Sequence, residues 1–168
     1  HDKMIKAFPG TVESLAELAS AGLKLGVVTS KRHAVAWRGL EVVGAASYLD
    51  CCVGWDDIDR PKPNPQPVVR GCELLGFDPS ECLYVGDAPF DLQSGNAAGA
   101  KTAAVTWGMF NEPALTAERP SFVSHTWDEL LAMAETYKGQ GGTKDGIVFL
   151  SKQDEGLTCL ATEFTSTF

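Results

Sequence analysis

The sequence lacks any long apolar segment, any signal-like start and any concentration of basic residues. Its longest apolar runs, such as Leu25 to Val28 and Ile147 to Leu150, are far shorter than the roughly 20 residues that span a bilayer. Lys and Arg number 14 against 22 Asp and Glu, which gives a net charge of -8. Binding of a nucleic-acid backbone requires a basic surface. We therefore expect a cytoplasmic protein with neither a membrane nor a nucleic acid as partner.

Cysteine pairs with metal-ligand spacing are also missing. The five Cys residues include no CxxC pair and have no histidine cluster near them. Because most lie in apolar segments, we expect buried free thiols in a reducing compartment. The chain has 168 residues, of which 44% are hydrophobic, and this suffices for a real core. We expect a core domain over residues 1–138 and a flexible or hairpin tail over 139–168.

The stretch 82–99, CLYVGDAPFDLQSGNAAG, joins a buried strand to a helix. Gly86 permits a tight turn after the strand, and the small residues 97–99 are typical of a helix packed closely on a sheet. Asp87 and Asp91 follow the strand. Since ligands bind at the carboxyl ends of strands in open α/β sheets, two carboxylates here favour a Mg²⁺ site. The alternative is that Asp87 merely caps the helix.

A second strand, predicted over 23–29, also ends in polar residues. Thr29, Ser30 and Lys31 follow its apolar part, before a helical pattern over 32–43. A hydroxyl beside the free backbone N–H groups of a helix start forms a seat for an anion, and Thr29 is our first candidate. The alternative makes Thr29 a helix N-cap. We expect Lys31 and Arg32 to be solvated or to face the substrate, without a catalytic role.

The loop 54–67, GWDDIDRPKPNPQP, contains four prolines that hold it extended. Lys62 is therefore presented from a stiff segment, where its ammonium group can meet a phosphoryl oxygen or a carboxylate. The alternative is an ordinary solvent-exposed lysine.

The other elements alternate between short apolar strands and amphipathic helices, which predicts an α/β fold with a parallel sheet. They are a helix over 11–21, a strand over 48–53, a helix over 68–75, a strand over 101–107, a loop over 108–120, a strand over 121–124 and a helix over 126–137. In the tail, 147–150 and 157–161 read either as a hairpin or as disorder.

The order of Thr29, Lys62 and the pair Asp87 and Asp91 resembles that of the haloacid dehalogenase-like phosphatases, in particular the phosphoglycolate phosphatase and pyrophosphatase branch. The resemblance covers residues 9–137, through LGVVTSK, DRPKPNPQPV and YVGDAPFDLQSGNAAGAKTAAVTWG. It implies a three-layer, Rossmann-like parallel sheet. It also implies a Mg²⁺-dependent phosphatase that acts on a small phosphorylated metabolite through an aspartyl-phosphate.

The resemblance assigns a role to each candidate residue. Thr29 and Ser30 would bind the transferring phosphoryl group, and Lys62 would offset the charge on the phosphoryl oxygens and on the nucleophile. Asp87 would ligate Mg²⁺, and Asp91 would support the metal site directly or through a second layer of contacts. Lys62 and Asp87 are thus the expected catalytic residues.

The sequence departs from the family at the nucleophile. Family members begin with a strand leading into DxDGT, which carries the nucleophile and the general acid and base, and this motif is absent here. The run 153–158, QDEGLT, has its acids adjacent, and we treat its likeness to the motif as chance. The family's helical cap is missing too, so the chain resembles a member truncated at its N-terminus. We expect it to be inactive alone; the alternative is a non-catalytic phosphate- or Mg²⁺-binding module, or one that depends on a partner.

The missing strand is central in the family fold, between the strands that end at Thr29 and Asp87. Its absence would leave two unpaired strand edges inside the sheet. One hypothesis is that the β-branched, apolar run 147–150 takes this position.

Overall fold

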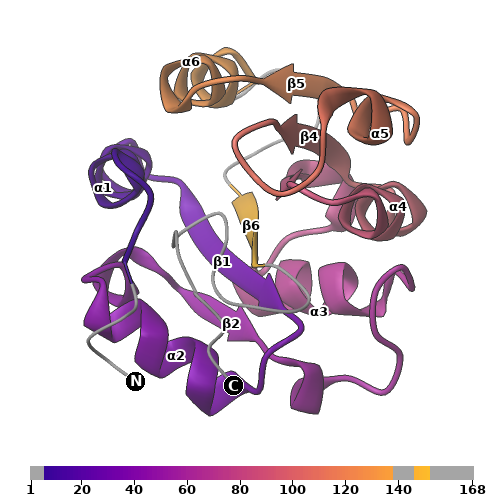
Figure 1. The fold of residues 1–168 in the computed structure, drawn as a ribbon. Helices are drawn as coiled ribbons and strands as arrows, with labels where there is room; N and C mark the ends of the chain where they lie inside the picture. The colour runs from indigo at the N-terminus through magenta and orange to yellow at the C-terminus, as the bar shows by residue number, and fades with distance from the viewer. Residues whose placement is uncertain (1–5, 138–145, 152–168) are drawn as a thin grey trace, which may run out of the picture.

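The computed structural model describes residues 6–137 and 146–151, which form an α/β fold around one parallel sheet (Figure 1). The strands are β1 (Lys24–Thr29), β2 (Cys51–Val53), β3 (Cys82–Gly86), β4 (Lys101–Val105), β5 (Phe122–Ser124) and β6 (Gly146–Ser151). The α-helices are α1 (Thr11–Ser20), α2 (His33–Val42), α3 (Gln66–Leu75), α4 (Pro89–Ala98), α5 (Glu112–Thr116) and α6 (Trp127–Tyr137). Short 3-10 turns are η2 (Ala46–Tyr48), η3 (Trp55–Asp57) and η4 (Pro79–Glu81).

Helices cover both faces of the sheet, which gives the expected three layers. In Figure 1, α1, α2 and α6 lie on one side and α3 and α4 on the other. Helix α4 approaches the sheet closely at Gly95, where a Cβ atom would lie 2.6 Å from Cγ2 of Thr102 and 2.7 Å from Cδ1 of Tyr84. The close approach predicted at residues 97–99 was wrong in its position, because these residues are exposed or half-buried. A larger residue at position 95 would push this helix off strands β3 and β4.

Strand β6 lies in the middle of the sheet, whose order is β2-β1-β6-β3-β4-β5. It pairs in parallel with β1 from Lys24↔Gly146 to Thr29↔Ser151, and with β3 from Cys82↔Gly146 to Val85↔Phe149. The last strand in the chain therefore separates β1 from β3. The hypothesis that residues 147–150 take the central position is confirmed.

The domain boundary at residue 138 stays a prediction, although β6 is part of the core sheet. The partner of the hairpin alternative, residues 157–161, lies outside the described residues. The predicted loop over 108–120 was wrong in part, because five of its residues form α5. Asn111 caps that short helix by accepting a hydrogen bond from the backbone of Ala114, a local signal that the loop prediction passed over.

The expected buried thiols are confirmed for the cysteines that the structure describes. Cys51, Cys52, Cys72 and Cys82 are free and buried, and burial raises the pKa of the Cys51 and Cys52 thiols to about 12. Cys159 lies outside the described residues. The thiols of Cys51 and Cys52 are accordingly uncharged at neutral pH, and the thiol of Cys51 donates a hydrogen bond to the backbone oxygen of Gly71 at 3.8 Å.

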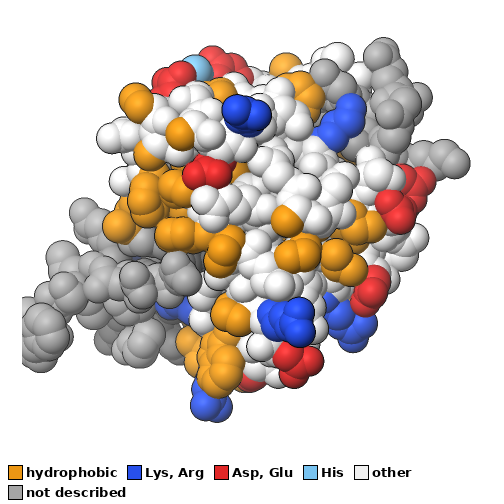
Figure 2. Space-filling view, turned by 90° about the vertical axis from the view of Figure 1, so that its right-hand side faces the viewer, with side chains coloured by type: hydrophobic (Ala, Val, Ile, Leu, Met, Phe, Trp, Pro, Cys, Tyr) orange, Lys and Arg blue, Asp and Glu red, His pale blue; other side chains and the backbone are white. Residues whose placement is uncertain are grey.

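The outer surface mixes charges of both signs. Figure 2 shows one face of the molecule, on which single Lys or Arg side chains alternate with Asp or Glu and with small hydrophobic clusters. That face, as far as its residues are described, has no continuous basic area of the kind that a nucleic-acid backbone needs. In the described part of the chain, every helix is too short or too polar to cross a bilayer.

A proline in β6 tests whether the sheet depends on this strand. Val148 is paired with Gly26 on one side and Tyr84 on the other, and proline has no N–H for the ladder. We expect Val148→Pro to lower the urea midpoint of unfolding strongly or to abolish the cooperative transition. Val148→Thr keeps the N–H and the β-branched shape and should cost much less. Equal midpoints for both variants would place β6 outside the sheet.

Candidate active site

The candidate residues meet at the carboxyl edge of the sheet. Thr29 is the last residue of β1 and pairs with Ser151, the last residue of β6. On the other side of β6, Phe149 pairs with Val85. Ser151 comes two residues after Phe149, and Asp87 comes two residues after Val85. The register therefore brings Thr29, position 151 and Asp87 level on three adjacent strands, as expected from the strand ends.

Lys62 and Asp91 form a buried ion pair beside these strand ends. The Nζ atom of Lys62 lies 2.8 Å from Oδ1 of Asp91, and the two side chains are 3% and 1% exposed. Ser94 of α4 donates a hydrogen bond to the backbone oxygen of Asn64 at 2.6 Å, which ties the proline-rich loop to the helix that carries Asp91. Burial rules out the alternative of a solvent-exposed Lys62.

Asp87 is fully buried and incompletely satisfied. Its Oδ2 accepts a hydrogen bond from the backbone N–H of Met109 at 3.4 Å, while its Oδ1 has no hydrogen-bond partner among the described residues. Burial, and then the nearby charge of Asp91, raises the pKa of Asp87 to about 6. The N-cap of α4 is Ala88, so the alternative in which Asp87 caps the helix is wrong.

Burial also raises the pKa of Asp91, against the opposing effect of the Lys62 ammonium group. Two carboxylates and a single lysine are thus held together away from water. A divalent cation would relieve the repulsion between Asp87 and Asp91 and would satisfy the orphan oxygen of Asp87.

The donor set fits Mg²⁺, which binds hard oxygen ligands and commonly keeps water or substrate phosphate in its remaining positions. Within residues 6–137 and 146–151, no cluster of three His, Cys, Asp or Glu side chains is present that could enclose an ion. The described carboxylates therefore suit a metal ion that they coordinate only in part. A bound anion would fill some of its remaining coordination positions.

Thr29 is placed to contact such an anion. It is 3% exposed, and its Oγ1 accepts a hydrogen bond from the backbone N–H of Lys31 at 3.0 Å. This leaves the hydroxyl proton available as a donor. The N-cap of α2 is Arg32, so Thr29 is not the helix cap. Ser30 follows it in a half-buried position.

Sequence reasoning missed the loop that covers Asp87. A Cβ atom on Gly108 would overlap Oδ2 and Cβ of Asp87, so only glycine permits this loop to pass. The rings of Phe90 and Phe110 meet edge to face at 5.7 Å and help to fix the same loop. The strand predicted over 101–107 gave no sign of this contact, because Gly108 and Asp87 are far apart in the sequence.

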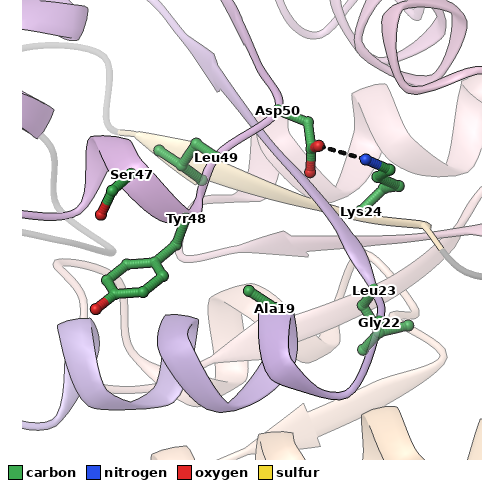
Figure 3. Close-up of a pocket in the computed structure, with 8 residues that line it drawn as sticks. All are labelled: Ala19, Gly22, Leu23, Lys24, Ser47, Tyr48, Leu49 and Asp50. Atoms are coloured by element: carbon green, nitrogen blue, oxygen red, sulfur yellow. Dashed lines mark hydrogen bonds and ion pairs between the residues drawn. The ribbon is translucent and has the colours of Figure 1, made fainter.

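A cavity of about 250 Å³ lies at the amino-terminal end of β1, away from these residues (Figure 3). Lys24 and Asp50 in its wall point toward one another and form an ion pair of 2.7 Å, and Asp50 also accepts from the backbone of Leu25. Because its charged groups already satisfy each other, this cavity is a weaker candidate than the edge with Asp87.

Replacement of Gly108 tests the close contact with Asp87. The new methyl group in Gly108→Ala must displace either the loop or the carboxylate, and overpacking of this kind costs about 1–3 kcal/mol. We expect that loss in the free energy of urea unfolding. Met109→Ala is the matched control, since Met109 is 61% exposed and its backbone donor is kept. A Gly108→Ala variant as stable as this control would contradict the described packing.

Comparison with known proteins places the chain in a family. The family model for haloacid dehalogenase-like hydrolases matches residues 1–105. The pyrophosphatase PpaX of Bacillus velezensis is 37% identical over 131 residues, which are 78% of this chain and 61% of that protein. The PpaX of Bacillus pumilus is 38% identical over 133 residues, with 79% and 62% covered. The chain thus spans about three fifths of the length of these relatives.

Solved structures agree with these sequence relatives. A protein described as a predicted phosphoglycolate phosphatase from Haemophilus somnus superposes with a TM-score of 0.70 at 25% identity, covering 75% of this chain and 56% of that one. A β-phosphoglucomutase from Clostridium difficile shares the fold with a TM-score of 0.64 at 19% identity, covering 77% and 56%. Fold, site and sequence lead to one conclusion: this chain belongs to the haloacid dehalogenase-like hydrolases.

Proposed function

We propose that this chain carries the phosphate and Mg²⁺ site of a phosphatase for small phosphorylated metabolites, similar to a phosphoglycolate phosphatase. The observation that carries the proposal is the buried Lys62–Asp91 pair next to Asp87, whose Oδ1 lacks a partner among the described residues. The relatives named pyrophosphatase support a substrate with a phosphoryl group.

Each residue has a distinct role in this proposal. The hydroxyl of Thr29 and the polar turn at Ser30 bind the transferring phosphoryl group. Lys62 places its ammonium group between that phosphoryl group and the acids, and so lowers the repulsion that an anionic nucleophile meets. Asp87 and Asp91 would hold Mg²⁺, which when bound neutralises charge on the phosphoryl oxygens.

The central strand ends without a carboxylate. Position 151, level with Thr29 and Asp87, is a serine, and the family's nucleophilic aspartate has no counterpart among the described residues. We therefore propose that the chain by itself binds phosphate with Mg²⁺ and does not turn it over. The same observation favours the second candidate, a non-catalytic binding module. In such a module, binding of phosphate with Mg²⁺ without turnover is itself the function.

Calorimetry with Mg²⁺ and orthophosphate tests the binding site. We expect the unmodified chain to bind orthophosphate only with Mg²⁺ present, and Asp87→Asn to weaken that binding at least tenfold because it removes a charged metal ligand. Asp128→Asn, at an exposed position of α6, removes the same charge elsewhere and should change nothing. Equal binding by the two variants would remove Asp87 from the site.

A carboxylate at position 151 tests whether the site is otherwise competent. In Ser151→Asp, a carboxylate oxygen would attack phosphorus, the bond to the leaving oxygen would break, and water would later release phosphate and restore the carboxylate. We expect Mg²⁺-dependent release of p-nitrophenol from its phosphate ester above the background of the unmodified chain. Ser151→Asn has nearly the same size and no charge, and it should stay at background. If the two variants release p-nitrophenol at the same rate, the central position is not the place of the nucleophile.

A further inference from the structure

The loop that carries Lys62 is poor in backbone hydrogen-bond donors. Pro61, Pro63 and Pro65 each lack a backbone N–H. The N–H of Asn64 donates to the backbone oxygen of Pro61 at 3.0 Å and closes a short turn around Lys62. With three of its donors missing, the loop depends on hydrogen bonds to side chains for its position.

Gln66, the first residue of α3, fastens the start of this loop. Its side-chain oxygen Oε1 accepts a hydrogen bond from the backbone N–H of Asp59 at 3.1 Å and another from that of Arg60 at 2.7 Å. Its own backbone N–H donates to Oδ1 of Asn64 at 3.0 Å. One glutamine thus joins both arms of the loop, and none of the roles assigned above uses it.

Lys62 lies midway between two attachments of the loop. Two residues before it, the N–H of Arg60 is held by Gln66. Two residues after it, the backbone oxygen of Asn64 accepts from the hydroxyl of Ser94 at 2.6 Å. The prolines on either side of Lys62 fix their own φ angles. The backbone of Lys62 is therefore held in place from both directions.

A fixed backbone matters for a buried lysine. The Nζ atom of Lys62 lies 2.8 Å from Oδ1 of Asp91, and a long side chain held in this way loses much of its rotamer entropy. Pre-organising the loop removes the further cost of ordering it. Gln66 is half-buried and its two donors belong to exposed residues, so water can replace its bonds without unfolding of the sheet.

We propose that Gln66 is a positioning residue, which holds the loop so that the ammonium group of Lys62 stays against Asp91. It acts through the backbone of the loop. A glutamate at this position could accept the same two hydrogen bonds, whereas a methionine of similar length offers only a weak acceptor. The value of this arrangement for phosphate binding rests on the proposed function, but the hold on Lys62 does not.

Methylation of the Lys62 amine with formaldehyde and cyanoborohydride tests the inference on the full chain, without ligand. Mass spectrometry gives the rate for Lys62 relative to Lys24, whose side chain is 55% exposed. We expect Gln66→Met to raise this rate about fivefold or more, because the loss of two hydrogen bonds favours the open loop. Gln66→Glu should keep the rate within about twofold of that of the unmodified chain, because it keeps the acceptor.

Two controls separate this role from a general loss of stability. Gln93→Met makes the same change at an exposed position of α4 and should leave the Lys62 rate unchanged. The thiol of Cys72, fully buried in α3, reports on opening of the core through its reaction with N-ethylmaleimide. Below the unfolding transition, labelling of Cys72 should rise with urea. Labelling of Lys62 in Gln66→Met should barely change, because a local opening exposes little surface.

The inference is overturned if Gln66→Met labels Lys62 no faster than Gln93→Met does, or if Gln66→Glu labels it as fast as Gln66→Met. It is also overturned if labelling of Lys62 rises with urea as steeply as that of Cys72, which would make the glutamine merely structural. A separate arm with Mg²⁺ and orthophosphate should slow the labelling of Lys62 in the unmodified chain. If it does not, the proposed function fails, and the rates without ligand still decide on Gln66.

Discussion

The hydrogen bonds of β6 to β1 and β3 are the constraint on which the rest of the structure depends. They pair six residues of β1 and four of β3 with a strand that comes last in the sequence. Without that strand, the inner edges of β1 and β3 would leave backbone N–H and C=O groups unpaired in the middle of the sheet. Since Thr29 and Asp87 sit on those two strands, the spacing of the site is set by β6.

The carboxyl edge of the sheet has an ordered distribution of charge. Asp87 and Asp91 lie at the β3 end under the loop of Gly108, with Lys62 against Asp91, while Lys31 and Arg32 lie beyond β1. Buried acids without a full set of partners lower the stability of a fold. Such groups are therefore found mainly at functional sites, where a bound ion can compensate for the missing partners. This distribution of charge is the basis on which we propose that one edge of the sheet binds a metal and a phosphate together.

Much of this arrangement follows from the sequence, because strand ends and turn residues are local signals. Thr29 and Asp87 were predicted from short stretches, and the β-branched run in β6 indicated its position. The direct pairing of Lys62 with Asp91, the passage of Gly108 over Asp87 and the stacking of Arg32 on Trp55 were not predicted. Each joins residues more than 20 positions apart, and their contacts arise only once the sheet is assembled. Helix α5 was missed because five residues carry too little periodicity.

The most direct measurement is the set of interstrand nuclear Overhauser effects in the full chain. We expect contacts from the backbone protons of residues 147–150 to those of Leu25 to Val28 on one side and Leu83 to Val85 on the other, in the parallel register of the sheet. Contacts that run directly between β1 and β3, with none to residues 147–150, would contradict it.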